Sequence, residues 1–426
     1  MGKVKKINKR EGNMRKVFTK IFAIVLLGLV LSVSSIFILS DRRISFAPGE
    51  PKSSEELDKN NLKDKTSNNK TSNDDQDKEF EDSGKDINSN ENTEPKENSE
   101  TGENTETEED TQLSVKISFA GDVLLASGVE SLIEQKGTEF IISDVKHIFE
   151  ESDISMVNLE CAISEIGTKA PDKQFTFRAK PQTLDVLKFS KMDIVSLANN
   201  HTLDFGVEAL LDTFQNLRDY GIKYAGAGMN MDEAARPVFI EENGIKIAFI
   251  ASSRVIPVVS WTAGENTPGL AVTYDPKRTL EEIASAKKQA DIVVVYVHWG
   301  EERKEMPLDY QKNMARAYID EGADIVVGAH PHVLQGLEFY KGKLIAYSLG
   351  NFIFTDSRKD TMVLQVEVNK SGVEGVRIIP CRIENLRPVL IKDEEERAKL
   401  IEKVESLSFD VEIDMDGFVN FKQTEF

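Results

Sequence analysis

Short apolar runs alternate with amphipathic stretches over most of the chain after residue 113. The apolar runs are rich in β-branched residues and bounded by Gly, Asp or Asn, which predicts buried strands. The predicted strands are 115–120, 153–159, 193–198, 246–251, 291–297, 324–329 and 344–349. Segments 207–221 and 311–322 place apolar residues at helical spacing and end on Gly, which predicts helices. This alternation is typical of an α/β domain.

The pattern changes after Asn351. The runs 362–368 and 376–384 follow each other with no helical stretch between them, so they predict a hairpin or a sheet edge. Residues 394–407 predict a terminal helix. We therefore expect a main domain over 113–390 and a C-terminal extension, 391–426, that packs on it.

The N-terminus carries a different signal. Residues 21–39 contain no charge and are about long enough to cross a bilayer. Lys and Arg dominate residues 1–20, so the positive-inside rule predicts a cytoplasmic N-terminus, one transmembrane helix and an extracytoplasmic domain. A cleaved signal peptide is the alternative, but the apolar run exceeds the usual length and no A-x-A cleavage site closes it.

The segment 40–112 predicts a disordered linker. Within 48–111, 21 acidic residues face 8 basic ones and large apolar residues are scarce, so the segment cannot bury enough surface to offset its ordering entropy. The whole chain of 426 residues has a formal charge of −20, and its acidity argues against nucleic acid as a partner. An acidic domain that acts on an anionic substrate needs local positive charge, which bound metal ions supply.

The chain has two cysteines, Cys161 and Cys381. They are too few for a disulfide framework, although a single bridge between them is compatible with an oxidising exterior.

Polar side chains follow five of the predicted strands. They are Asp122, then Asn158 and Glu160, then Asn199, Asn200 and His201, then His298, and finally His330 and His332. In α/β sheets, ligands bind beyond the carboxyl ends of the strands, so these residues predict one shared site. Imidazole, carboxylate and amide oxygen together suit Mn, Fe or Zn.

Each of these residues also has a plain structural explanation. Asp122 and Asn200 suit helix caps or turns, Glu160 suits a surface ion pair, and His298 suits a buried core histidine. The pair in His330-Pro331-His332 is the hardest to explain without a ligand, because one turn presents two imidazoles. Taken together, the five strand ends favour a metal site. His147, in a helix-like stretch, is expected to be an ordinary surface or half-buried residue.

Seven sequence motifs follow one another in the domain: "FAGDVLL", "NLECAIS", "FTFRAKP", "SLANNHTLDFG", "VHWGEE", "GAHPHVLQGLE" and "YSLGNFIF". In this order they resemble the CapA family of capsule-synthesis proteins, which is associated with poly-γ-glutamate. The resemblance covers about 115–355. It implies a calcineurin-like metallophosphoesterase fold, an α/β/β/α sandwich with a dinuclear metal site.

The resemblance also implies roles for individual residues. Asp122 matches the first aspartate ligand, Glu160 the bridging carboxylate and Asn200 the asparagine ligand. His298, His330 and His332 match the imidazole ligands. His201 matches the histidine that protonates the leaving group, and Asp204 is a carboxylate placed to orient it.

Two positions depart from the wider superfamily. Leu124 stands where the first motif usually has a histidine ligand, so one metal site loses a ligand. Glu160 replaces an aspartate, and its extra methylene changes the spacing of the metals.

We expect one divalent ion held by Glu160, Asn200, His298 and His330, and a second near Asp122, Glu160 and His332. Arg178 and Asn158 are candidate substrate-binding residues, Arg178 as a planar clamp for carboxylate or phosphate. A surface salt bridge is the alternative for Arg178.

The predicted function is a membrane-anchored, extracytoplasmic role in capsule or poly-γ-glutamate formation, through a hydrolase-type site acting on a phosphoester or on the polymer. Two alternatives stay open: a non-catalytic accessory subunit of a polymer synthase or export complex, and a module that binds an anionic polymer.

Overall fold

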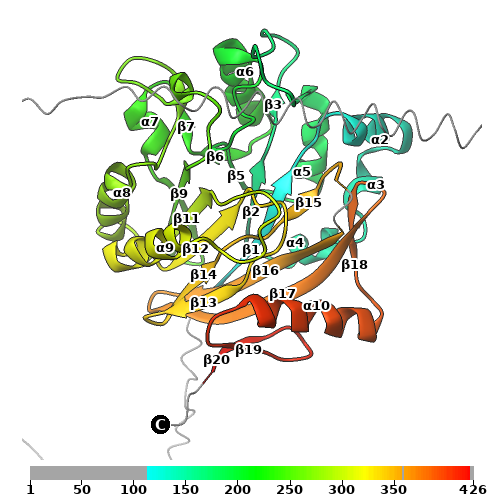
Figure 1. The fold of residues 1–426 in the computed structure, drawn as a ribbon, viewed down its shortest axis with the longest axis vertical. Coiled ribbons are helices and arrows are strands. Elements are labelled where there is room, and N and C mark those ends of the chain that lie inside the picture. The colour runs from blue at the N-terminus through cyan, green and yellow to red at the C-terminus, as the bar shows by residue number, and fades with distance from the viewer. Residues whose placement is uncertain (1–112, 357–358, 423–426) are drawn as a thin grey trace, which may run out of the picture. The chain divides into compact units, whose positions relative to one another are not determined.

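Two β-sheets lie at the centre of the computed structural model, which describes residues 113–356 and 359–422 (Figure 1). The eight-stranded sheet has the order β18-β17-β16-β1-β2-β5-β6, with β15 also beside β1. Its strands are β1 (Val115–Val123), β2 (Ile154–Leu159), β5 (Ile194–Ser196), β6 (Lys223–Ala225), β15 (Asn351–Ile353), β16 (Asp360–Asn369), β17 (Gly372–Glu384) and β18 (Arg387–Leu390).

The six-stranded sheet has the order β13-β14-β12-β11-β9-β8. Its strands are β8 (Val238–Glu242), β9 (Ile245–Ser253), β11 (Ile292–His298), β12 (Ile325–Ala329), β13 (Leu337–Tyr340) and β14 (Lys343–Ala346). All seven predicted strands are present, and the mixed α/β class is confirmed.

The strands that lead to the polar residues run parallel within each sheet. In the eight-stranded sheet β1, β2, β5 and β6 are parallel neighbours. In the six-stranded sheet the same holds for β9, β11, β12 and β14. Parallel strands end at the same edge, so each sheet gathers its own set of strand-end loops.

The two sheets pack on each other through a single apolar cluster. Phe119 and Met156 from one sheet and Phe249, Tyr296 and Val327 from the other are fully buried in it. Large side chains removed from water in this way supply most of the driving force that holds two sheets together.

Helices cover the outer faces of both sheets. A second apolar cluster joins the eight-stranded sheet to α2 (Gly128–Lys136), α3 (Thr138–Ile142), α4 (Lys146–Glu150), α5 (Asp185–Phe189) and α6 (Gly206–Asp219). A third joins the six-stranded sheet to α8 (Lys277–Lys287) and α9 (Asp309–Glu321). The layers therefore run helix, sheet, sheet, helix (Figure 1).

The two predicted helices correspond to α6 and α9. In α6, Leu210, Phe214 and Leu217 recur at helical spacing and are buried. Gly221 follows α6 with φ +74°, and Gly322 ends α9 with φ +125°. Glycine favours both positions because a Cβ disfavours positive φ.

The C-terminal part adds a hairpin and a helix, as the sequence predicts. β16 and β17 pair antiparallel, and α10 (Glu394–Leu407) contacts β17 and β13. A small hairpin of β19 (Val411–Ile413) and β20 (Val419–Phe421) follows and touches β13 and β17.

Several short elements carry no clear signal in the sequence. They are β3 (Ala162–Ile163), β4 (Arg178–Ala179), β7 (Ala227–Gly228), β10 (Gly269–Leu270), α7 (Met231–Ala235), and the 3-10 turns η1 (Pro181–Leu184) and η2 (Val259–Trp261). β3 pairs with β4, and β7 with β10, as two-stranded pieces outside the main sheets.

Three predictions fall outside the described residues: the cytoplasmic segment over 1–20, the transmembrane anchor over 21–39 and the disordered linker over 40–112. Within the described ranges, no helix has the length and apolar character that a membrane span requires. Cys161 and Cys381 are both buried and both free, so they do not form a disulfide.

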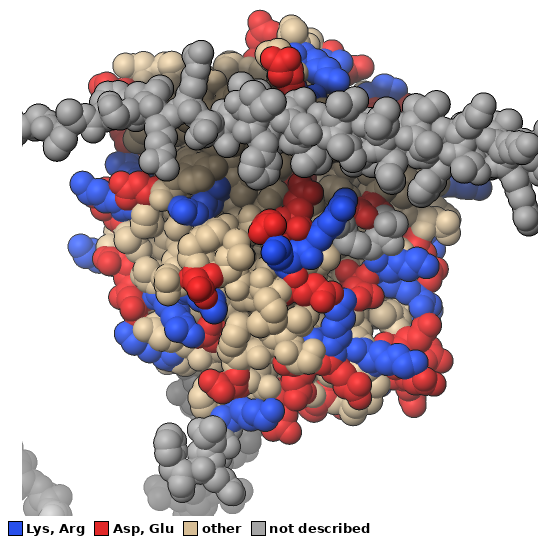
Figure 2. Space-filling model, in the orientation of Figure 1, with Lys and Arg blue, Asp and Glu red and all other residues tan. Residues whose placement is uncertain are grey.

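Acidic and basic side chains are interspersed on the face in Figure 2, around an area without charged groups. Among the described residues visible there, Lys and Arg do not gather into a broad basic surface of the kind that binds a nucleic-acid backbone.

Candidate metal centre

Strand-end loops from both sheets converge at one place. The eight-stranded sheet brings Asp122 at the end of β1, Glu160 just after β2, and Asn200 and His201 after β5. The six-stranded sheet brings His298 as the last residue of β11, and His330 and His332 just after β12. The structure thus brings together side chains that lie up to 210 positions apart in the sequence.

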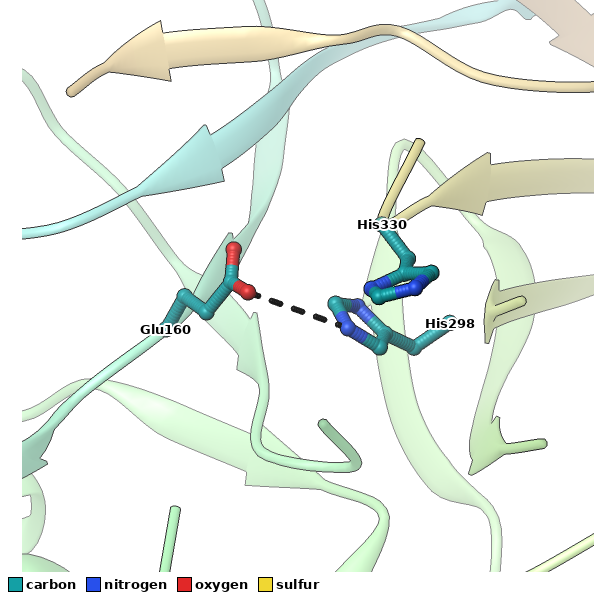
Figure 3. Close-up of side chains that lie close together, drawn as sticks. All are labelled: Glu160, His298 and His330. Atoms are coloured by element: carbon teal, nitrogen blue, oxygen red, sulfur yellow. Dashed lines mark ion pairs between the residues drawn. The ribbon is translucent and has the colours of Figure 1, made fainter. Parts of the chain in front are cut away.

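One group of potential ligands consists of Glu160, His298 and His330 (Figure 3). One ligand atom from each lies within 4.8 Å of the others, and all three residues are buried. Glu160 Oε1 is 3.8 Å from His298 Nε2. The Asn200 side-chain oxygen lies 3.0 Å from the same Nε2, so it borders this group.

A second group consists of Asp122, Glu160 and His332, again with ligand atoms within 4.8 Å of one another. His332 Nδ1 lies 3.3 Å from Asp122 Oδ2, and His332 Nε2 lies 3.8 Å from Glu160 Oε1. Glu160 therefore belongs to both groups, which is the position that a bridging carboxylate requires.

The contacts of Glu160 test whether a cation fits. Its side chain is fully buried, yet neither carboxylate oxygen has a hydrogen-bond partner. Burial, followed by the neighbouring Asp122 carboxylate, raises the pKa of Glu160 well above its usual value. A buried carboxylate without donors is costly, and a divalent ion would supply the missing charge. The donor set of carboxylates, imidazoles and one amide oxygen therefore fits a divalent metal.

Two of the imidazoles are held in the form that binds metal. Burial lowers the pKa of His298 well below its usual value and that of His330 to about 3, so both are neutral at pH 7. His332 differs: burial alone lowers its pKa, but the Glu160 and Asp122 carboxylates outweigh this and raise it to about 9.

The turn that carries His330 and His332 has an uncommon backbone. His330 has φ +94° and His332 has φ +57°, in the region that glycine favours. The His330 amide donates to Asp122 Oδ2 at 3.3 Å, which ties this turn to β1. Positive φ in non-glycine residues is strained and persists only where the surrounding structure maintains it. Such residues cluster at functional sites.

His201 and Asp204 form a buried pair beside the ligand groups. His201 Nδ1 and Asp204 Oδ2 are 2.7 Å apart, and the Phe177 amide donates to the same oxygen at 2.7 Å. Burial lowers the pKa of His201, and the hydrogen bond with Asp204 partly opposes this effect. Asp204 thus fixes the orientation of His201 and leaves Nε2 free of this pairing.

Lys173 is a member of the site that sequence reasoning missed. Its ammonium donates to Asp204 Oδ1 and, at 2.5 Å, to the Asn200 carbonyl oxygen. It also lies 2.9 Å from His201 Nδ1. Lys173 lies in an irregular loop, where no periodicity or motif pointed to it.

Asn351 was missed as well. Its side-chain oxygen lies 2.8 Å from His332 Nδ1, an arrangement that fixes the ring and turns Nε2 toward Glu160. Asn351 follows the last predicted strand just as the other site residues follow theirs, so the strand-end pattern contained the signal.

Asn158 lies behind the ligands. It is fully buried, donates to Asp122 Oδ1 at 2.8 Å and accepts from Asn199 at 3.0 Å. These contacts orient Asp122, and the substrate-binding role expected from the sequence stays a prediction.

Arg178 engages the protein itself. Its guanidinium donates to the Ile166 carbonyl oxygen at 2.8 Å and lies 4.2 Å from the Phe205 ring centre. These contacts hold the 166–167 loop, and the substrate-clamp role stays a prediction.

Leu124 is fully buried in the apolar cluster under the helices. The position of the usual histidine ligand is therefore part of the core in this chain. His147 lies exposed in α4, as expected.

The family model for bacterial capsule synthesis protein PGA_cap matches residues 116–356, more than half of the chain and all of the metal centre. This chain belongs to the PGA_cap family. It is 35% identical over 289 residues to the PGA biosynthesis protein CapA of Bacillus subtilis, with 67% of this chain and 76% of the relative covered. It is 31% identical over 282 residues to the capsule biosynthesis protein CapA of Bacillus anthracis, covering 64% and 68% respectively.

Among solved structures, this PGA_cap protein is similar to a phosphatase from Mycoplasma pneumoniae, with a TM-score of 0.42 and 14% identity over 64% of this chain and 94% of that one. It is also similar to an NAD nucleotidase from Haemophilus influenzae, with a TM-score of 0.36 and 14% identity over 72% of this chain and 57% of that one.

Proposed function

We propose that this PGA_cap protein is a membrane-anchored, extracytoplasmic, metal-dependent phosphoesterase of capsule or poly-γ-glutamate formation, built on a calcineurin-like sandwich. The family membership and the names of its Bacillus relatives support the biological role. The uncharged segment 21–39 supports the anchor. Polymer synthase subunits at the membrane are the partners that this role implies.

The observation that carries the catalytic proposal is the environment of Glu160. A fully buried carboxylate with two unpartnered oxygens faces imidazoles from the opposite sheet. A divalent ion bound there would neutralise phosphoryl charge and lower the pKa of a coordinated water. Glu160, His298 and His330, with Asn200 beside them, would hold one ion, and Asp122, Glu160 and His332 a second.

His201 is the proton donor in this proposal. In the imidazolium form of His201, Nδ1–H donates to Asp204 and Nε2–H is left to give its proton to the leaving oxygen of a phosphoester. Burial lowers the pKa of His201, and the Asp204 carboxylate opposes this effect and favours the charged form. Lys173 neutralises Asp204 and holds the Asn200 carbonyl, which keeps the loop 199–204 in one arrangement. Asn351 and Asn158 orient His332 and Asp122.

The test compares His201→Ala with His147→Ala in the full chain, supplied with Mn²⁺ or Zn²⁺ and assayed on aryl and alkyl phosphoesters. General acid catalysis contributes about 10²–10⁴-fold, so His201→Ala should lose activity on that scale. His147→Ala is the matched control, because His147 is an exposed histidine outside the site. If His201→Ala keeps full activity, His201 is not the proton donor.

Metal content after gentle purification is the second measurement. We expect at least about one divalent ion per chain, as the two ligand groups imply. A chain without bound metal that still binds γ-glutamyl polymer would favour the polymer-binding alternative. A metal-free chain that co-purifies with membrane subunits would favour the accessory role.

The anchor is tested separately, by comparing the full chain with a variant that lacks residues 1–39. The full chain should remain in the membrane fraction after alkaline carbonate washing, and the shortened chain should not. Retention of the shortened chain would show that 21–39 is not the anchor.

A further inference from the structure

A cavity of about 330 Å³ opens beside the metal centre. Two site residues, His201 and His332, line it together with the aromatic rings of Phe175, Phe177 and Phe354. Because His201 is the proposed proton donor, any group that fills this cavity lies next to the oxygen that receives the proton.

The phenyl rings are packed against the site imidazoles. The centres of the Phe177 and His201 rings are 4.6 Å apart, and those of Phe354 and His332 are 4.8 Å apart. Phe175 is 60% exposed, so its ring is available to a ligand. An apolar ligand group would remove this ring and the cavity walls from water, which is favourable in proportion to the area buried.

The charged groups of the lining limit the kind of ligand further. The lining includes one guanidinium, that of Arg303, and two carboxylates, those of Glu302 and Asp356. The Arg303 amide donates to the Pro331 carbonyl at 2.8 Å, which holds this side of the cavity to the turn that carries His330 and His332. Cations do not outnumber anions here, so a polyanionic group gains no net attraction from the lining.

We propose that this cavity is the leaving-group pocket of the site, and that the substrates are phosphoesters of an apolar alcohol, aryl or alkyl. The inference rests on the proposed phosphoesterase function and names its substrate class. The phosphoryl group would lie at the ligand groups, where a water oxygen bonds to phosphorus as the P–O bond to the alcohol breaks. His201 gives its proton to the departing ester oxygen, so the products are phosphate and the free alcohol. The apolar part of that alcohol packs between the phenylalanine rings.

The experiment measures binding of two phosphonates that cannot be hydrolysed, phenylphosphonate and methylphosphonate, to the Mn²⁺-loaded full chain by calorimetry. Burial of a phenyl ring should make the first bind about tenfold more tightly than the second. Phe175→Ala should reduce this ratio to about threefold, because it removes one wall of the pocket. Phe418→Ala is the matched control, since Phe418 is 49% exposed, does not line the cavity, and should leave the ratio unchanged.

Equal affinity for the two phosphonates in the unaltered chain would overturn the proposal. A preference that persists in full in Phe175→Ala would overturn it as well. A third ligand, 4-carboxyphenylphosphonate, tests the charge argument: binding at least tenfold tighter than phenylphosphonate would show that the pocket takes an anionic group. If the chain binds neither Mn²⁺ nor any phosphonate, the proposed phosphoesterase function fails together with the pocket, an outcome distinct from the other three.

Discussion

The length of the Glu160 side chain determines which imidazoles its carboxylate can approach. Its Oε1 lies 3.8 Å from Nε2 of both His298 and His332, so a single oxygen is equally distant from an imidazole of each ligand group. The sequence indicated that glutamate in place of aspartate changes the metal spacing. In the structure the longer arm lets a residue beyond the end of β2 reach ligands from the opposite sheet.

Lys173 provides a prediction at the same scale. Its ammonium is largely buried against Asp204, which is itself fully buried, and burial lowers its pKa although Asp204 opposes this. Lys173→Met leaves the Asp204 carboxylate without its cation, so we expect the free energy of unfolding to fall by about 3 kcal/mol in urea titrations.

Lys180→Met is the matched control for Lys173→Met. Lys180 also pairs with a carboxylate, that of Glu134 at 2.6 Å, but both side chains are more than half exposed. Exposed pairs contribute little, so this variant should unfold at the same urea concentration as the unaltered chain. Equal losses in the two variants would contradict a stabilising role for the buried pair.

At the level of elements, the close approach of β1 and β15 shapes the site. A Cβ added to Gly121 would lie 1.9 Å from the Gly350 carbonyl oxygen, and the neighbouring Asp122 amide donates to that same oxygen. Gly121→Ala must push the two strands apart, so we expect a loss of about 3 kcal/mol in stability and weaker metal binding as Asp122 moves.

Gly137→Ala is the comparison for Gly121→Ala. Gly137 ends α2 with φ +86°, but a Cβ there meets nothing within 4 Å. Its ψ of 161° places Gly137 in a region that is essentially restricted to glycine. The cost should be about 1–3 kcal/mol, from the backbone conformation alone, and metal binding should not change. Similar effects of both substitutions on metal affinity would argue against a steric displacement of Asp122.

The sequence predicted the strands of the site better than their arrangement. Runs such as 291–297 and 324–329 are apolar and β-branched throughout, because parallel strands are covered on both faces. The same property makes β1 and β11 alike in pattern, so periodicity alone did not reveal that they belong to different sheets. Only the family resemblance pointed to two sheets.

Shorter and half-exposed elements escaped prediction for a related reason. β8 is only partly buried along its length, and β3 and β4 have two residues each, too few to display a period. Lys173 lies in a loop without regular structure, and its partner Asp204 is 31 positions away in the sequence. Such contacts depend on how the loop folds back, which local composition does not encode.

For the whole molecule, the two free cysteines give a prediction for alkaline pH. Burial raises the pKa of Cys161 and of Cys381 to about 12, against about 8.5 for a thiol in an unfolded chain. The folded chain holds both thiols in the neutral form. The stability that this contributes is complete below about pH 8.5 and is lost as pH rises toward 12. Each thiol should lower the free energy of unfolding by about 1.4 kcal/mol per pH unit in that range.

Urea unfolding at pH 8 and pH 10 measures this effect, and the double variant Cys161→Ala, Cys381→Ala should show a shallower dependence on pH. Alkylation offers an independent check, since both thiols should resist iodoacetamide at pH 8 until the chain unfolds. Rapid labelling of the folded chain would contradict their burial.

The ligands come from two separate sheets, so metal binding affects how firmly the two sheets are held together. The two sheets share no strand pairing in the described residues, yet each contributes side chains to both ligand groups. A bound ion would therefore join the layers at one rim, and metal at a hundred times its dissociation constant would add about 2.7 kcal/mol to the folded state. Chelation should lower the melting temperature and speed amide exchange at the ends of β1 and β11.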